Sequence, residues 1–156
     1  MQAVFLPGLQ LSRAFYAEAV RPLLDDVPHS AARIGAGSEV LGFDTPRSAD
    51  HEWGPRLEVF LSPAAAGRGP ELHRRLAEGL PRTFRGFPTH FEPVEGDRIG
   101  RMAPTDGPVH HRVALGTVER WCTDRLGIDP RAGLRTVDWL TPVSYTHLTL
   151  PTNREV

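Results

Sequence analysis

The sequence contains no lysine, and all 18 of its basic residues are arginines. Without lysine the chain cannot form a P-loop, whose Gly-Lys-Ser/Thr segment binds nucleotide phosphates, and it cannot form a lysine Schiff base. The single cysteine, Cys122, excludes an intrachain disulfide and a zinc site built from several cysteines. The composition is therefore typical of a protein from a reducing compartment.

Long apolar runs and an excess of one charge are also missing. No apolar stretch approaches the roughly 20 residues that a membrane span requires. The segment Met1–Pro7 has no basic residue ahead of an apolar run, so we expect no secretion signal. Its 18 basic and 19 acidic residues nearly balance, whereas proteins that neutralise many nucleic-acid phosphates usually carry a basic excess. We expect a cytoplasmic protein that binds neither nucleic acid nor a membrane.

The length and composition favour one folded domain followed by a short tail. The chain has 156 residues, of which 40% are hydrophobic, enough for one compact core. From Ser144 onward it is rich in threonine and has no helical periodicity. This end resembles translated sequencing adapter. We therefore expect residues 1–142 to form the domain, residues 143–156 to be a non-native tail, and the natural protein to continue past Pro142.

Periodic apolar residues predict an α/β (α+β) fold, with a small mixed sheet flanked by helices. The expected helices span Leu9–Leu24, with Pro22 at its end, a segment that starts at Pro70, and Val118–Leu126 between a Thr117 cap and a Gly127 stop. The expected strands span Ala31–Ile34, Leu57–Leu61 and Arg112–Gly116. Phe84–Gly107 is predicted to be mostly loop, with one short strand at Thr89–Phe91.

The strongest chemical pattern is Gly37-Ser38, followed after eleven residues by Asp50-His51-Glu52. A Gly-Ser turn after a strand exposes backbone N–H groups to an anion, and a helix that began at Glu39 would add its dipole. Residues two apart on a strand share a face, so Asp50 and Glu52 would project together and could bind Mg²⁺. His51 would point away.

This pattern resembles the nucleotidyltransferase superfamily, whose signature is Gly-Ser or Gly-Gly followed about a dozen residues later by acid-x-acid on a strand. The segment from Gly37 to Arg56 resembles, more narrowly, a branch of that superfamily known as a domain of unknown function. The resemblance extends over residues 9–142 and implies a nucleotidyltransferase-like fold. Relatives in this branch continue into a helical second half that this chain lacks.

The resemblance implies Mg²⁺-dependent transfer of a nucleoside monophosphate from an NTP to a hydroxyl of a small molecule or a protein. Gly37 and Ser38 would then bind the nucleotide phosphates, and Asp50 and Glu52 would be the catalytic residues that bind the metal. Glu52 stands where many relatives have aspartate. The alternative is a catalytically degenerate module of the same fold that binds a nucleotide or a partner.

A third carboxylate, which the superfamily usually supplies as apolar-acid-apolar on a later strand, is not assigned by the sequence. The strand at residues 112–116 has Ala114 at the middle position. Three other triplets match the pattern, centred on Glu58, Glu92 and Asp138. The choice among them stays open, as does activity itself.

Overall fold

The computed structural model describes residues 4–35, 37–47, 53–95 and 97–140. Helix α1 (Gly8–Phe15) continues through a π-helical turn (Tyr16–Val20) into a 3₁₀ turn (Arg21–Leu23). The predicted first helix is thus confirmed as one helical segment. Pro22 lies in its last turn. The helical segment ends there because a proline ring removes a backbone donor and crowds the preceding turn.

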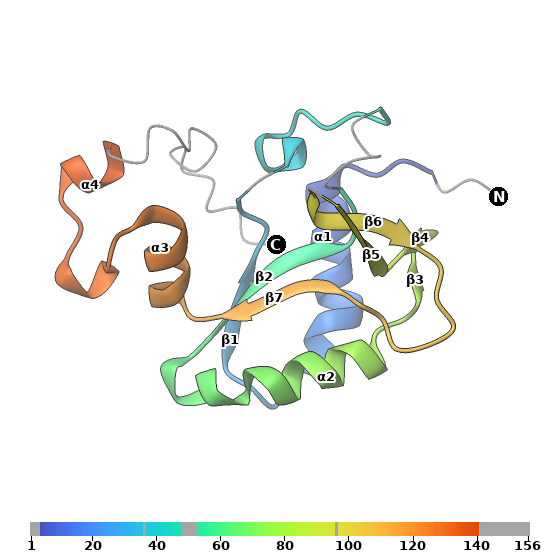
Figure 1. Cartoon of the computed structure of the whole chain (residues 1–156), viewed down its shortest axis with the longest axis horizontal. Coiled ribbons are helices and arrows are strands. Elements are labelled where there is room, and N and C mark those ends of the chain that lie inside the picture. The colour runs from blue at the N-terminus through green and yellow to red at the C-terminus, as the bar shows by residue number, and fades with distance from the viewer. Residues whose placement is uncertain (1–3, 36, 48–52, 96, 141–156) are drawn as a thin grey trace.

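A three-stranded mixed sheet forms the centre of the molecule (Figure 1). Its strands are β1 (His29–Ala32), β2 (Arg56–Leu61) and β7 (Arg112–Gly116), in the order β1-β2-β7. β1 runs antiparallel to β2, and β2 runs parallel to β7. The chain therefore leaves β1 at the same end of the sheet at which it enters β2 and β7.

Alternation along the strands gives the sheet one apolar face and one polar face. Leu57, Val59 and Leu61 of β2 are buried in the main core, together with Val113 of β7. Helices α1 and α2 (Gly69–Gly79) complete this core, α1 with Leu11 and Phe15 and α2 with Leu72 and Leu76. The spacing of four between Leu72, Leu76 and Leu80, which predicted α2, places all three in the core.

The segment between α2 and β7 departs from the sequence prediction. Instead of loop with one short strand it forms two hairpins, β3 (Thr83–Phe84) with β4 (Phe87–Pro88), and β5 (His90–Val94) with β6 (Asp97–Ala103). Pro93 and Gly100 lie inside these strands, and both residue types are depleted in strands. The pairing of β5 with β6 is irregular between Glu92 and Val94. Tertiary pairing overrides the local signal here.

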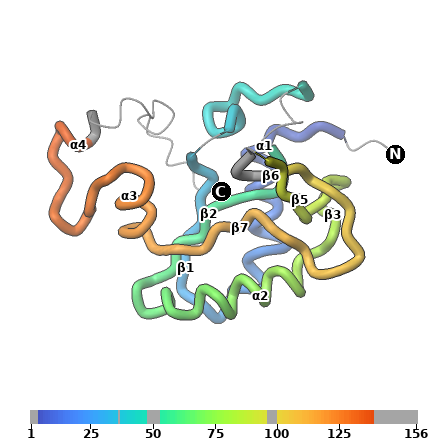
Figure 2. Tube along the Cα trace, viewed as in Figure 1, coloured from blue at the N-terminus to red at the C-terminus, as the bar shows by residue number. Residues whose placement is uncertain are grey.

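Helix α3 (Val118–Leu126) begins and ends as the sequence predicts. The Thr117 hydroxyl accepts a hydrogen bond from the backbone N–H of Arg120, and Gly127 adopts the left-handed conformation that ends the helix. After a 3₁₀ turn (Pro130–Ala132), the described chain ends with α4 (Thr136–Leu140). Figure 2 shows α3 and α4 extending away from the sheet and α2. None of the described helices has the length and apolarity needed to span a membrane.

Candidate functional site

The structure describes only part of the sequence-predicted site. Asp50 and Glu52, the proposed catalytic and metal-binding residues, lie outside the described residues. Gly37 and Ser38 are described and follow β1. The helix considered from Glu39 is instead a 3₁₀ turn that begins at Ser38 and spans Ser38–Leu41. Such a short turn contributes little dipole, so Gly37 and Ser38 offer backbone N–H groups and one hydroxyl.

A buried ion cluster lies directly beside this turn. The Glu39 side chain is 2% exposed, and its Oε1 accepts hydrogen bonds from Arg33 Nη2 at 2.5 Å and from Arg56 Nη2 at 2.9 Å. Both guanidiniums also donate to the same oxygen through Nε. Burial, together with the charge of Arg56, lowers the pKa of Arg33. Glu39 thus joins the segment after β1 to the first residue of β2.

Gly37 packs against this cluster. Its φ is +127°, in the region that only glycine adopts at little cost, and a Cβ there would overlap Glu39 Oε2 and Arg56 Nη2. The glycine is therefore required by both the backbone conformation and the close approach of buried side chains. This explains Gly37 structurally.

Asp44 holds a second part of the same segment. One oxygen of its carboxylate, Oδ2, accepts the backbone N–H of Gly8, the first residue of α1, at 2.6 Å, and the indole N–H of Trp53 at 3.1 Å. Trp53 is buried, stacks on Phe5 and meets Phe87 edge-on. A negative charge at a helix N-terminus is favourable, because it complements the helix dipole.

Much of the segment from Gly37 to Arg56 is therefore a structural frame. The sequence pattern predicted binding roles for Gly37 and Ser38 and catalytic roles for Asp50 and Glu52. It did not predict the structural roles of Glu39, Asp44 and Arg56. Their partners lie 6 to 36 residues away along the chain. The only local signal is a lone acid, Glu39, directly before the apolar pair Val40-Leu41.

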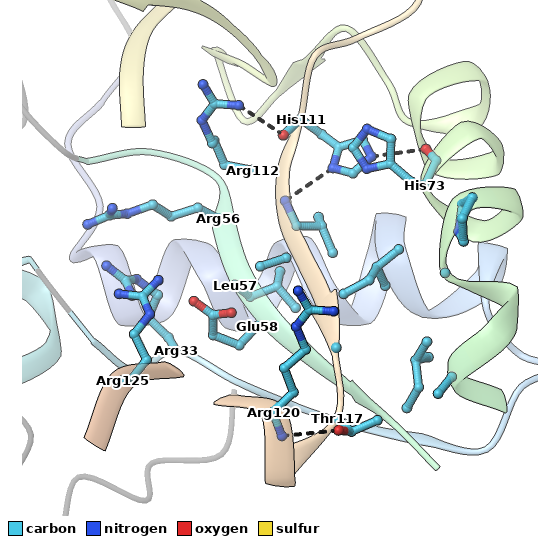
Figure 3. Close-up of a pocket in the computed structure, with 18 residues that line it drawn as sticks. Arg33, Arg56, Leu57, Glu58, His73, His111, Arg112, Thr117, Arg120 and Arg125 are labelled. Atoms are coloured by element: carbon cyan, nitrogen blue, oxygen red, sulfur yellow. Dashed lines mark hydrogen bonds between the residues drawn. The ribbon is translucent and has the colours of Figure 1, made fainter. Parts of the chain in front are cut away.

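A pocket of about 880 Å³ runs across β7, an edge strand of the sheet, from the start of α2 to α3, and apolar residues of β2 and β7 line it together with polar ones (Figure 3). Its lining is dominated by five arginines: Arg33, Arg56, Arg112, Arg120 and Arg125. Arg33 and Arg56 belong to the buried cluster beside Gly37, so the pocket and the Gly37-Ser38 turn share a wall. Arg112 lies over the Phe91 ring at 5.5 Å, whereas Arg120 and Arg125 extend from α3.

Glu58 is the carboxylate of this pocket, among the residues described. It pairs across the parallel strands with Ala114, the position at which the sequence lacks an acid. In Figure 3 its carboxylate points toward Arg33 and Arg125. Burial raises the pKa of Glu58, and the charges of Arg125, Arg33 and Arg56 oppose that rise.

The other two candidates for the third acid lie outside the pocket lining. Glu92 is exposed on β5, 3.9 Å from Arg101. Asp138 forms a 3.0 Å ion pair with Arg135 near the end of the described chain, and these contacts lower the pKa of Asp138. Of the three triplets left open by the sequence, only the one centred on Glu58 contributes to the polar face of the sheet.

Two histidines line the pocket at its α2 end, and their rings lie 4.3 Å apart. The His111 Nε2–H donates to the His73 carbonyl, and Nδ1 accepts the backbone N–H of Val113. Burial lowers the pKa of His111 to about 4, so this ring is neutral at pH 7. No group of three or more His, Cys, Asp or Glu side chains able to hold a metal ion occurs among the described residues.

Comparison of the chain with protein-family models, with curated proteins and with solved structures gave no match. Inferences about function therefore depend on the geometry of the site and on the sequence pattern.

Proposed function

We propose that this chain is a nucleotidyltransferase-like domain that transfers a nucleoside monophosphate from an NTP to a hydroxyl of a small molecule or a protein. One observation carries the proposal: β1 ends, and β2 and β7 begin, at the same end of the sheet. The Gly37-Ser38 turn follows β1, and Asp50 and Glu52 precede β2 by a few residues. The described half of the sequence pattern, the Gly37-Ser38 turn, therefore lies at the end of the sheet at which the chain enters β2.

Mg²⁺ is the metal that the pattern implies. Among the described residues the pocket offers one carboxylate, Glu58, which is surrounded by arginines, so these residues alone do not form a magnesium site. Asp50 and Glu52 would have to supply the ligands. A bound Mg²⁺ would neutralise phosphate charge and hold the phosphates in place.

The described residues favour phosphate binding at this place. The Gly37-Ser38 turn contains backbone N–H groups, the exposed Ser38 adds a hydroxyl donor, and arginines supply positive charge on the adjacent wall. Transfer of a nucleotidyl group needs charge neutralisation and alignment more than covalent help from the protein. Glu58 is positioned on the same wall to accept a proton from a hydroxyl acceptor.

Nucleotide titration tests the proposal. The chain should bind an NTP in the presence of Mg²⁺, and Asp50→Ala or Glu52→Ala should weaken that affinity by at least about tenfold, since each removes a proposed metal ligand. Glu92→Ala, which removes an exposed carboxylate outside the pocket, is the matched control. Unchanged affinity in the Asp50 and Glu52 variants would overturn the proposal.

The second candidate is a degenerate module that binds a nucleotide or a partner without turnover. Ala114 favours it, because this position of β7 carries no acid. The two candidates differ in one measurement, release of pyrophosphate from a bound NTP when hydroxyl acceptors are supplied. Pyrophosphate release that Asp50→Ala abolishes supports the transferase, whereas nucleotide binding without release supports the degenerate module.

A further inference from the structure

We propose that the pocket across β7 binds a polyphosphate chain directly through arginine side chains, without a metal ion. This goes beyond the proposed function, because it assigns phosphate recognition to β7 and α3 rather than to the segment from Gly37 to Glu52. It holds whether or not the bound molecule is then transferred.

The charge of the lining is the first argument. Arg33 and Arg56 are buried and share Glu39, so they form a fixed positive wall. Arg112, Arg120 and Arg125 reach the pocket from β7 and α3. Among the described residues that line the pocket, Glu58 is the acidic side chain that accompanies these five arginines. An anion is therefore the ligand that this pocket favours.

The accessibility of the α3 arginines is the second argument. The Arg120 side chain is 80% exposed, and its contact with Asp124 is a long one, at 3.4 Å, on the helix surface. Arg125 is exposed one helical turn further on. Exposed ion pairs of this kind contribute little stability, so these guanidiniums can reorient toward a ligand at small cost. A guanidinium presents paired N–H donors that match two phosphate oxygens.

The spread of the cations is the third argument, and it distinguishes a phosphate chain from a single small anion. Arg112 stands at the first residue of β7, and Arg120 lies beyond its last residue. These two arginines thus approach the pocket from opposite ends of a five-residue strand. At about 3.3 Å per residue the strand is about 13 Å long, so guanidiniums held at its two ends match linked phosphates better than one orthophosphate. The volume of about 880 Å³ also exceeds what one such ion fills.

Glu58 sets a limit on this binding. Its carboxylate faces Arg33 and Arg125, the same cations that an entering anion would use. Removing its charge while keeping its shape should therefore strengthen anion binding. A protein that merely attracted anions by overall charge would gain no more from this change than from any other lost carboxylate.

The probe is inorganic tripolyphosphate, titrated into the full chain by calorimetry in EDTA and about 0.15 M salt, where weak surface attraction is screened. The Arg120→Gln/Arg125→Gln double variant should weaken binding by at least about tenfold. Glu58→Gln should tighten it several-fold, and Asp50→Ala should leave it unchanged. Arg101→Gln/Arg135→Gln, which removes two exposed arginines outside the pocket, is the charge-matched control.

Three results would overturn the inference: no binding of tripolyphosphate in EDTA, equal weakening by the pocket and control double variants, or equal affinity for orthophosphate. A parallel titration with ATP in EDTA identifies the source of the phosphates. Equal affinities assign recognition to the phosphate chain alone, and tighter binding of ATP adds a nucleoside contact. Loss of Mg²⁺-dependent NTP binding in Asp50→Ala is a separate result, so either proposal can fail without the other.

Discussion

Glu58 of β2 and Ala114 of β7 are cross-strand partners on the polar face of the sheet. The sequence pattern would place an acid at residue 114 of β7. The carboxylate of this pocket lies instead on the neighbouring strand, β2, about 4.8 Å away. The Glu58 carboxylate points toward Arg33 and Arg125 (Figure 3). The sequence alone offered three triplets for the third acid, and this pairing separates Glu58 from the other two.

Glu58→Gln is predicted to stabilise the fold at neutral pH. Burial raises the pKa of Glu58, so the folded chain holds this proton more tightly than the unfolded chain. The contribution of Glu58 to the free energy of unfolding therefore falls as pH rises from about 4.5, the ordinary carboxyl value, through the raised value. Thermal unfolding at pH 7 should show a higher midpoint for the variant, and the difference should vanish below pH 4. A lower midpoint at pH 7 would mean that the arginines outweigh burial.

Glu39→Gln is predicted to be severely destabilising. The substitution leaves two buried guanidiniums, Arg33 and Arg56, around a neutral side chain, and breaking a buried ion pair in this way typically costs about 3–5 kcal/mol. Glu71→Gln is the matched control, because Glu71 pairs with Arg68 and Arg75 on an exposed helix face, where ion pairs contribute little, so this substitution should cost far less. Urea unfolding of both variants measures the contrast, and equal losses would contradict it.

Gly37→Ala is predicted to destabilise the chain more than Gly35→Ala. Both glycines have positive φ, +127° and +90°, so each alanine pays about 1–2 kcal/mol of backbone strain. A Cβ at residue 37 would also overlap Glu39 and Arg56, whereas at residue 35 it would meet nothing within 4 Å. The overlap should add about 1–3 kcal/mol in chemical denaturation. Equal destabilisation by the two substitutions would show that Glu39 and Arg56 can move aside at little cost in free energy.

The contribution of His111 to the stability of the chain is predicted to fall as pH drops from 6.5 to 4. The pKa of His111 in the folded chain is about 4, against 6.5 for an ordinary histidine. Between these values the unfolded chain binds a proton that the folded chain does not bind. The loss reaches about 3 kcal/mol at the low end. His111→Gln should flatten this part of the pH–stability curve, measured by urea unfolding at several pH values. A curve that His111→Gln leaves unchanged would contradict the prediction.

Features of the fold that depend on neighbouring residues were predicted well. The Thr117 cap, the Gly127 stop and the strand at Arg112–Gly116 agree with the structure residue for residue. The first strand lies two residues earlier than predicted, at His29–Ala32, since its short apolar run gave little information on register. A capping hydroxyl or a helix-ending glycine acts within one turn, so its signal is contained in the local sequence.

Features that depend on distant partners were not predicted. The two hairpins between α2 and β7 pair segments that carry proline and glycine, and the pairing of β5 with β6 is irregular between Glu92 and Val94. The role of Asp44 needs Gly8, which lies 36 residues earlier. The buried position of Glu39 needs two arginines at separations of 6 and 17 residues. No window of local sequence contains these contacts.

The Asp44 carboxylate couples the N-terminal helix to the proposed site. It holds the first N–H of α1 and the indole of Trp53 at once, so the helix start cannot fray without releasing the tryptophan that precedes β2. Amide hydrogen exchange at Gly8 should therefore slow when a ligand binds at the proposed site, which makes the backbone of α1 a remote reporter of occupancy.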